Sequence, residues 1–113
     1  MSRNLIILPV YNRGAAINGI VSRIMDSLGN QTDLVVVDDG SEDDTGKKVR
    51  TSERVFCIVH EESLGYGAAL SNGLQFAKDM GYDFAVAIDA MDQKSHYAFS
   101  PILQELAAGH AVV

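Results

Sequence analysis

The chain has 113 residues, of which 47% are hydrophobic, and it carries a net charge of −6 with an isoelectric point near 4.8. These values predict one domain, residues 1–113, with enough apolar side chains for a core, and they argue against nucleic-acid binding through a basic surface. The N-terminus shows no signal-peptide pattern and no apolar run approaches the roughly 20 residues that span a bilayer, so a cytoplasmic protein without a transmembrane segment is expected.

The first elements expected along the chain are a strand and an amphipathic helix. Residues 5–10, LIILPV, predict a strand that ends at Pro9. Residues 15–28 predict a helix whose apolar side chains recur at helical spacing: Ile17, Ile20, Val21, Ile24, Met25 and Leu28. The run 34–37, LVVV, predicts a second strand that is buried on both faces.

The middle of the chain is more polar before it returns to the same alternation. Residues 43–54 predict one short helix, and residues 55–59, VFCIV, predict a third strand that contains the single cysteine, Cys57, as a buried and reduced thiol. Residues 64–81 predict a second long helix. Its expected buried stripe is Tyr66, Ala69, Leu70, Gly73, Leu74 and Ala77. Small residues in this segment would let the helix lie close to the sheet: Gly67, Ala68, Ala69 and Gly73.

The last predicted elements complete an α/β pattern. Residues 84–88 predict a fourth strand, residues 101–108 a helix, and residues 111–113 the start of a fifth strand. Alternation of strands and helices predicts an α/β fold with a parallel sheet, strand order 3-2-1-4, and helices on both faces.

Polar side chains gather at the carboxyl ends of three predicted strands, which is the edge where open α/β sheets bind ligands. They are Tyr11 and Asn12 after the first strand, Asp38 and Asp39 after the second, and Asp89 and Asp92 after the fourth. A purely structural alternative is that Asp39-Gly40 only forms a turn and that Ser41 or Asp44 only caps the next helix.

Carboxylates that converge on one crevice repel each other unless a cation lies between them. Asp89, Asp92 and Gln93 offer oxygen ligands of the kind that Mg²⁺ or Mn²⁺ prefers, and a solvated acidic loop is the alternative. The carboxylate of Asp39 can accept a hydrogen bond from the ring N–H of uracil or guanine, whereas adenine has no such donor. Tyr11 can place an aromatic ring beside that base, or it can be a turn residue that packs on the first helix.

Other chemistry is poorly supported by the sequence. Gly65-Tyr66-Gly67 lacks the third glycine of a dinucleotide-binding loop, and no phosphate-binding GxxxxGK[ST] motif is present. The histidines stand in no catalytic or zinc-binding spacing and are expected to be surface or loop residues: His60, His96 and His110. A receiver-like phosphoacceptor domain is disfavoured, because Tyr11-Asn12 and His60-Glu61 occupy the positions where it needs its acidic residues.

Four motifs taken together resemble the family 2 glycosyltransferases with the GT-A fold, and most closely the polyprenyl-phosphate branch that includes dolichol-phosphate-mannose synthases. The motifs are LPVYN at 8–12, VVVDDGSEDDT at 35–45, LGYGAALSNGL at 64–74 and IDAMDQ at 88–93. The resemblance implies a Rossmann-like nucleotide-binding half, a UDP- or GDP-sugar donor, a divalent metal and inverting transfer. By position it places Pro9 and Tyr11 beside the base and Asp39 on the base N–H. Asp38 would support the loop, and Asp89 and Gln93 would lie at the metal and diphosphate.

The resemblance also implies an acceptor half, with a general base, that lies beyond residue 113. The chain is therefore expected to be a donor-binding half whose transfer activity needs an acceptor-domain partner or a further segment. Met91 stands where the family has a second carboxylate, Arg13 where it commonly has Glu, and Lys94 where it often has His. The alternative hypothesis is a non-catalytic interaction module that keeps the fold, for which self-association into a homo-oligomer would cover exposed apolar surface.

Overall fold

The computed structural model describes residues 3–27 and 32–88. In these residues the element order is β1 (Asn4–Val10), α1 (Ile17–Ser27), β2 (Thr32–Asp38), α2 (Thr45–Lys48), β3 (Val55–Val59), α3 (Tyr66–Asp79) and β4 (Phe84–Ala87). Each predicted strand and helix up to residue 88 is present, with bounds that shift by a few residues. The helix predicted at 101–108 and the strand predicted at 111–113 lie outside the described residues, as does Leu28.

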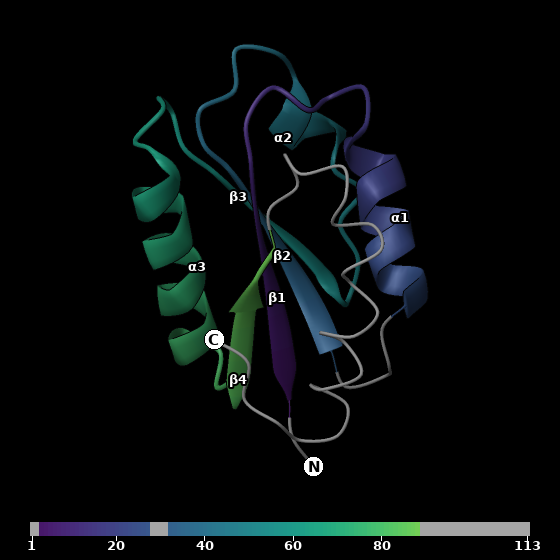
Figure 1. Cartoon of the computed structure of the whole chain (residues 1–113), viewed down its shortest axis with the longest axis vertical. Helices are drawn as coiled ribbons and strands as arrows, with labels where there is room; N and C mark the ends of the chain where they lie inside the picture. The colour runs from purple at the N-terminus through teal and green to yellow at the C-terminus, as the bar shows by residue number, and fades with distance from the viewer. Residues whose placement is uncertain (1–2, 28–31, 89–113) are drawn as a thin grey trace.

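The four strands form one parallel sheet in the order β3-β2-β1-β4, which confirms the predicted topology (Figure 1). The β1–β2 register pairs Val10 with Asp38, so these two strands end level with each other. On the other side of β1, the backbone N–H of Ile88 donates to the carbonyl oxygen of Ile7 over 2.9 Å. The fourth strand therefore lies beside the first, as the predicted site requires.

Pro9 lies inside β1, a central strand, although proline has no N–H for a sheet hydrogen bond. Alternate residues of a strand direct their backbone groups to the same side, so Pro9 faces the β4 side, as Ile7 does. Strand β4 ends at Ala87, which pairs with Ile7, and Pro9 lies two residues farther along. The ladder between β1 and β4 thus ends before the position where Pro9 would have to donate an N–H, and β1 itself continues to Val10 beside β2.

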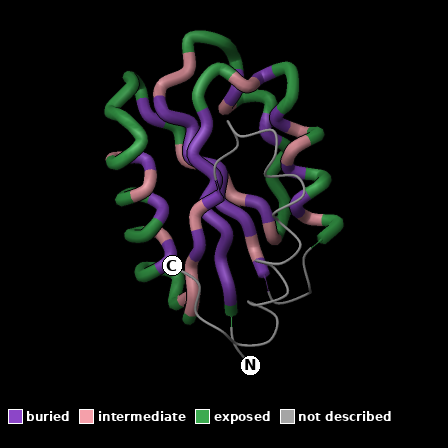
Figure 2. The backbone as a smooth tube through the Cα atoms, viewed as in Figure 1, coloured by how far each residue is buried: buried purple, intermediate pink, exposed green. Residues whose placement is uncertain are grey.

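Helices cover both faces of the sheet, as predicted: α1 lies on one side and α3 on the other (Figure 1). On the α1 face, the core joins Ile17, Val21 and Ile24 to alternate side chains of the central strands, such as Ile6 and Leu34. On the α3 face, Ala69 and Ala77 join the intervening side chains of the same strands. Burial on both faces explains why the central strands are buried along most of their length (Figure 2).

The buried face of α3 is narrower than its sequence suggested. Ala69, Gly73 and Ala77 are buried, whereas Tyr66 and Leu74 are 55% and 49% exposed, so their predicted burial is wrong. A Cβ on Gly73 would lie only 2.4 Å from Cγ2 of Ile7. The helix thus approaches the sheet through its smallest residues, which leaves the larger residues at its margins.

Candidate functional site

The carboxyl edge of β1 and β2 places Tyr11 beside Asp39. The two strands end at the paired residues Val10 and Asp38, and the backbone N–H of Asp39 donates to the carbonyl oxygen of Val10 over 2.9 Å. The side chain of Tyr11 is partly exposed, at 37%, whereas Asp38 and Asp39 are buried. Pro9 is buried within β1. Of the predicted nucleotide-binding residues, Tyr11 is therefore the one most open to a ligand.

Asp38 is satisfied by the segment that follows it in the chain. Its Oδ1 accepts hydrogen bonds from the backbone N–H of Ser41, over 3.2 Å, and from the hydroxyl of the same residue. Its Oδ2 accepts from the backbone N–H of Gly46 over 3.0 Å. These contacts hold the turn after β2 against the start of α2, which is the geometry that the predicted loop-supporting role of Asp38 requires.

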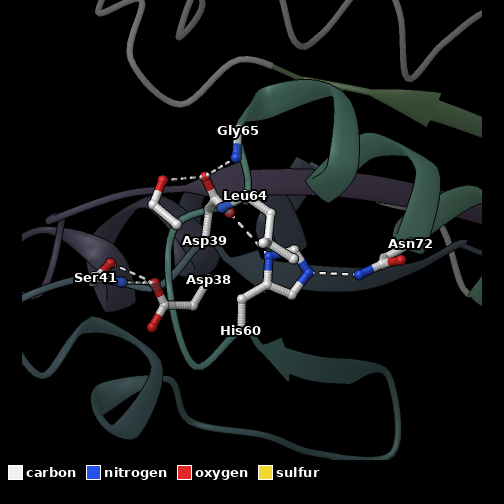
Figure 3. A network of polar contacts seen from close by, with 8 residues as sticks. Asp38, Asp39, Ser41, His60, Leu64, Gly65 and Asn72 are labelled. Atoms are coloured by element: carbon white, nitrogen blue, oxygen red, sulfur yellow. Dashed lines mark hydrogen bonds and ion pairs between the residues drawn. The ribbon is translucent and has the colours of Figure 1, made fainter.

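Asp39 points away from Asp38, toward the loop that precedes α3 (Figure 3). Each of its oxygens accepts two hydrogen bonds. Oδ1 accepts from Nδ1 of His60 over 2.9 Å and from the backbone N–H of Leu64 over 2.8 Å. Oδ2 accepts from the hydroxyl of Ser63 and from the backbone N–H of Gly65, both over 2.9 Å. An ionised carboxylate has about four lone-pair sites, so these four donors occupy the full accepting capacity of Asp39.

Burial and hydrogen bonding act in opposite directions on Asp39. Burial by itself would raise its pKa, but the hydrogen bonds from His60, Leu64, Ser63 and Gly65 more than offset burial and lower the pKa to about 2. The carboxylate is consequently ionised throughout the physiological pH range. An ionised acceptor is the form that can also receive an N–H from a base.

His60 is the residue that sequence reasoning missed. It lies in the loop after β3, as expected, but it is buried, 8% exposed, so a position on the surface is wrong for this histidine. Its Nδ1 contacts Asp39, and its Nε2 lies 2.5 Å from Nδ2 of Asn72 on α3 (Figure 3). With Nδ2 of Asn72 as the donor, Nε2 of His60 accepts, and its Nδ1–H donates to Asp39. The available signal was position, because His60 directly follows β3 as Asp38 and Asp39 come at the end of β2.

Asn12 connects the end of β1 to the loop after β2. Its backbone has a φ of 52°, a left-handed conformation that asparagine tolerates better than most residues. Its Oδ1 accepts the backbone N–H of Glu42 over 2.8 Å, and its own N–H donates to the hydroxyl of Ser41 over 2.9 Å. The backbone N–H of Arg13 donates to the hydroxyl of Thr45 over 2.9 Å. Two loops that are 30 residues apart in sequence are thus fastened together at the predicted ligand edge.

The predicted metal ligands Asp89, Asp92 and Gln93, together with His96, lie outside the described residues. Among residues 3–27 and 32–88, no group of three or more His, Cys, Asp or Glu side chains is arranged to hold a metal ion. A cavity of about 340 Å³ does lie between α2 and the end of β3. It is lined by Asp38, Ser41, Glu42, Asp43, Asp44, Gly46, Lys47, Val59, His60 and Glu61. The lining includes Asp38 but neither Tyr11 nor Asp39, so the cavity lies next to the predicted base-binding pair and not between its two residues.

The sheet order, the helices on both faces and the polar carboxyl edge define a Rossmann-like α/β domain of the GT-A type. The chain belongs to glycosyl transferase family 2, since the model of that family matches residues 5–113. This match confirms the resemblance that the four sequence motifs indicated.

The chain is also similar to glycosyltransferases of polyprenyl-type phosphates. It is 29% identical over 117 residues to a UDP-N-acetylglucosamine–dolichyl-phosphate N-acetylglucosaminyltransferase of Methanococcus voltae, an alignment that covers 89% of this chain and 46% of that relative. It is 31% identical over 112 residues to a polyprenol monophosphomannose synthase of Mycolicibacterium smegmatis, covering 95% of this chain and 42% of the relative. An undecaprenyl-phosphate mannosyltransferase of Micrococcus luteus is 32% identical over 92 residues, an alignment that covers 78% of this chain and 37% of that relative.

The chain thus spans less than half the length of these relatives. In the part of the chain that the structure describes, no helix is long and apolar enough to cross a membrane.

Proposed function

We propose that the chain is the donor-binding half of a glycosyltransferase that transfers a sugar from UDP or GDP to a polyprenyl-type phosphate. The family match over residues 5–113 carries this proposal. The three relatives described above are named for dolichyl, polyprenol or undecaprenyl phosphates, which supports this acceptor class. Because the chain spans less than half of each relative, the acceptor site and the general base are assigned to a further segment or a partner chain.

The nucleotide would bind at the carboxyl edge of β1 and β2. Tyr11 is partly exposed there and offers an aromatic ring for the base. Pro9 and Asp38 are both buried, so they would support the site indirectly, by shaping β1 and the turn after β2, without touching the nucleotide. Asp39 would accept the ring N–H of uracil or guanine. Its four present donors mean that one of them has to leave before a base can bind.

The diphosphate would be held by a divalent cation near the end of β4. Asp89, Asp92 and Gln93 follow this strand and supply only oxygen donors, which suit Mg²⁺ or Mn²⁺. Met91 lies between them, and a thioether is a poor ligand for such hard cations. The bound cation would supply charge stabilisation for the departing diphosphate.

Calorimetric titration of the chain with UDP and GDP, each with and without Mn²⁺, tests the proposal. Binding of one of these nucleotides, strengthened by Mn²⁺ and weaker for ADP, is the expected result. Tyr11→Ala should weaken that binding because it removes the aromatic contact, while exposed Tyr66, on the first turn of α3, provides a matched Tyr→Ala control. A folded chain that binds neither UDP nor GDP would contradict the proposal and favour the non-catalytic interaction module.

A further inference from the structure

Asp39 is the most heavily hydrogen-bonded side chain of the carboxyl edge, and its four donors differ in how easily they can leave. Two of them are backbone N–H groups, at Leu64 and Gly65, which cannot move without displacing the chain that leads into α3. The third is the ring of His60, which is buried and is also fixed by Asn72 on its other side. Each of these three donors is therefore tied to the fold.

The fourth donor is the hydroxyl of Ser63, which lies on an exposed residue. A serine hydroxyl moves by rotation about a single side-chain torsion, so it can leave Oδ2 of Asp39 and meet water without any backbone change. The side chain of Asp39 is itself 10% exposed. An incoming group can reach the carboxylate with the least disturbance if it takes the place of this hydroxyl.

We propose that Ser63 is an internal competitor for the ligand, its hydroxyl occupying the position on Asp39 that the ring N–H of the nucleotide base takes on binding. This inference rests on the proposed function and adds a specificity-determining residue to it. In the nucleotide-free chain Ser63 satisfies Oδ2. On binding, a base with an N–H donor restores the hydrogen bond that Ser63 gives up, and a base without one leaves the carboxylate short of a donor.

Replacement of the Ser63 hydroxyl by the base N–H would also make Asp39 selective for the kind of base. Uracil and guanine each carry a ring N–H beside a carbonyl, and adenine carries none. An adenine nucleotide would therefore have to displace Ser63 without returning a hydrogen bond from a ring nitrogen, or leave the serine in place. Ser63 thus adds to the preference for UDP or GDP over ADP.

Removing the competitor should strengthen binding. In the Ser63→Ala variant the ligand N–H meets an accepting position on Oδ2 that only water occupies, while the N–H of Gly65 keeps the other. The loss of one competing hydrogen bond corresponds to roughly threefold to tenfold tighter binding of UDP or GDP. The same variant should lower the midpoint of thermal unfolding slightly, because the folded chain loses a hydrogen bond. A residue with only a structural role would not produce these two opposite effects.

Three comparisons sharpen the measurement. Ser63→Thr keeps a hydroxyl donor and should bind the nucleotide within about twofold of the wild-type chain. Ser71→Ala removes an exposed serine from α3, should leave the affinity unchanged, and should not lower stability, because alanine favours a helix more than serine does. The third comparison uses UDP methylated at ring nitrogen N3, or GDP methylated at N1, whichever nucleotide binds. The methylated ligand has no ring N–H, so Ser63→Ala should give it no gain.

The outcomes separate this inference from the proposed function. Tighter binding of the unmethylated nucleotide by Ser63→Ala, absent for the methylated one, supports the inference. If the wild-type chain binds UDP or GDP and Ser63→Ala binds it equally or more weakly, the inference is overturned and the proposed function stands. If neither the wild-type chain nor the variant binds any of these nucleotides, both are overturned.

Discussion

The substitution Asp39→Asn changes only one side-chain atom, but it should destabilise the folded chain strongly. Asparagine keeps one acceptor oxygen and replaces the other with an NH₂ group, which is a donor. Because both oxygens of Asp39 accept two hydrogen bonds, either orientation of the amide sets its NH₂ against two donors. Hydrogen bonds to charged groups contribute about 1.5–3 kcal/mol each. Since the loop donors can turn partly to water, we expect the free energy of unfolding to fall by about 2–4 kcal/mol at pH 7.

The loss should depend on pH with a definite sign. The pKa of Asp39 falls from an ordinary value of 3.8 to about 2 in the folded chain. A pKa that is lower in the folded state contributes stability above pH 4, and this stability is lost as the pH falls from about 4 toward 2. A shift of this size corresponds to at most about 2.5 kcal/mol, and solvent beside the exposed loop reduces that figure toward half. The difference between wild type and Asp39→Asn should therefore shrink by about 1–2 kcal/mol between pH 5 and pH 2.5.

Urea unfolding followed by circular dichroism at pH 7, 5, 4, 3 and 2.5 measures this difference. The matched control is Asp44→Asn, since Asp44 is an exposed carboxylate at the start of α2 that makes no capping hydrogen bond with its side chain. The control should stay within about 0.5 kcal/mol of wild type. A loss below 0.5 kcal/mol for Asp39→Asn, or a loss that is constant from pH 5 to pH 2.5, would refute the four-donor account of Asp39.

Two further predictions concern the packing around the sheet. Gly73→Ala should lower the free energy of unfolding by about 1–3 kcal/mol, because the new Cβ would lie 2.4 Å from the side chain of Ile7. Gly67→Ala lies on the same helix with nothing within 4 Å of its added Cβ, and it should raise the free energy of unfolding by about 0.5–1 kcal/mol. Urea unfolding checks both variants, because the midpoint should fall for Gly73→Ala and rise for Gly67→Ala. Cys57 is half-buried and not fully buried as predicted. Its partial burial, and to a smaller extent the charge of Asp38, raise the pKa of its thiol to about 11. Iodoacetamide at pH 8 should thus alkylate Cys57 about a hundredfold more slowly in the folded chain than in the chain unfolded in urea. If the two rates differ by less than about tenfold, the raised pKa of Cys57 is contradicted.

Most of the fold was predictable because its strands and helices show apolar patterns over a few consecutive residues of the sequence. Residues 34–37 are apolar throughout because both faces of β2 are covered, and residues 55–59 form β3 with the predicted bounds. The error in α3 has a different origin. Periodicity identifies an apolar stripe but does not reveal how close the helix lies, and contact through Gly73 leaves Leu74 at the margin. The closeness depends on Ile7, which is 66 residues away in sequence and therefore invisible to a local pattern.

The site was predictable in position but not in its contacts. The end of a buried strand followed by Asp38-Asp39-Gly40 located the edge, and the sheet order then put Tyr11 beside it. The partners of Asp39 come from residues 60–65, more than 20 positions later, after another strand. His60 could not be recognised as one of them, because histidine is intermediate in its tendency to be buried and its position after a strand does not decide between burial and exposure. The structure resolves the choice through Asn72, which fixes the second ring nitrogen.

The opposite directions of the two neighbouring aspartates determine what remains for a ligand. Asp38 accepts its hydrogen bonds from the turn after β2 and from α2. Three of the four donors to Asp39, all except the hydroxyl of Ser63, are held in place by the fold. Two adjacent carboxylates would repel each other if they shared one ligand, and here each accepts hydrogen bonds from its own set of N–H and O–H donors instead. In the part of the edge that the structure describes, Asp38 and Asp39 thus need no cation between them. Any cation requirement should then arise from the diphosphate and the residues after β4, so nucleoside binding without phosphates should be independent of Mn²⁺ while UDP or GDP binding is not.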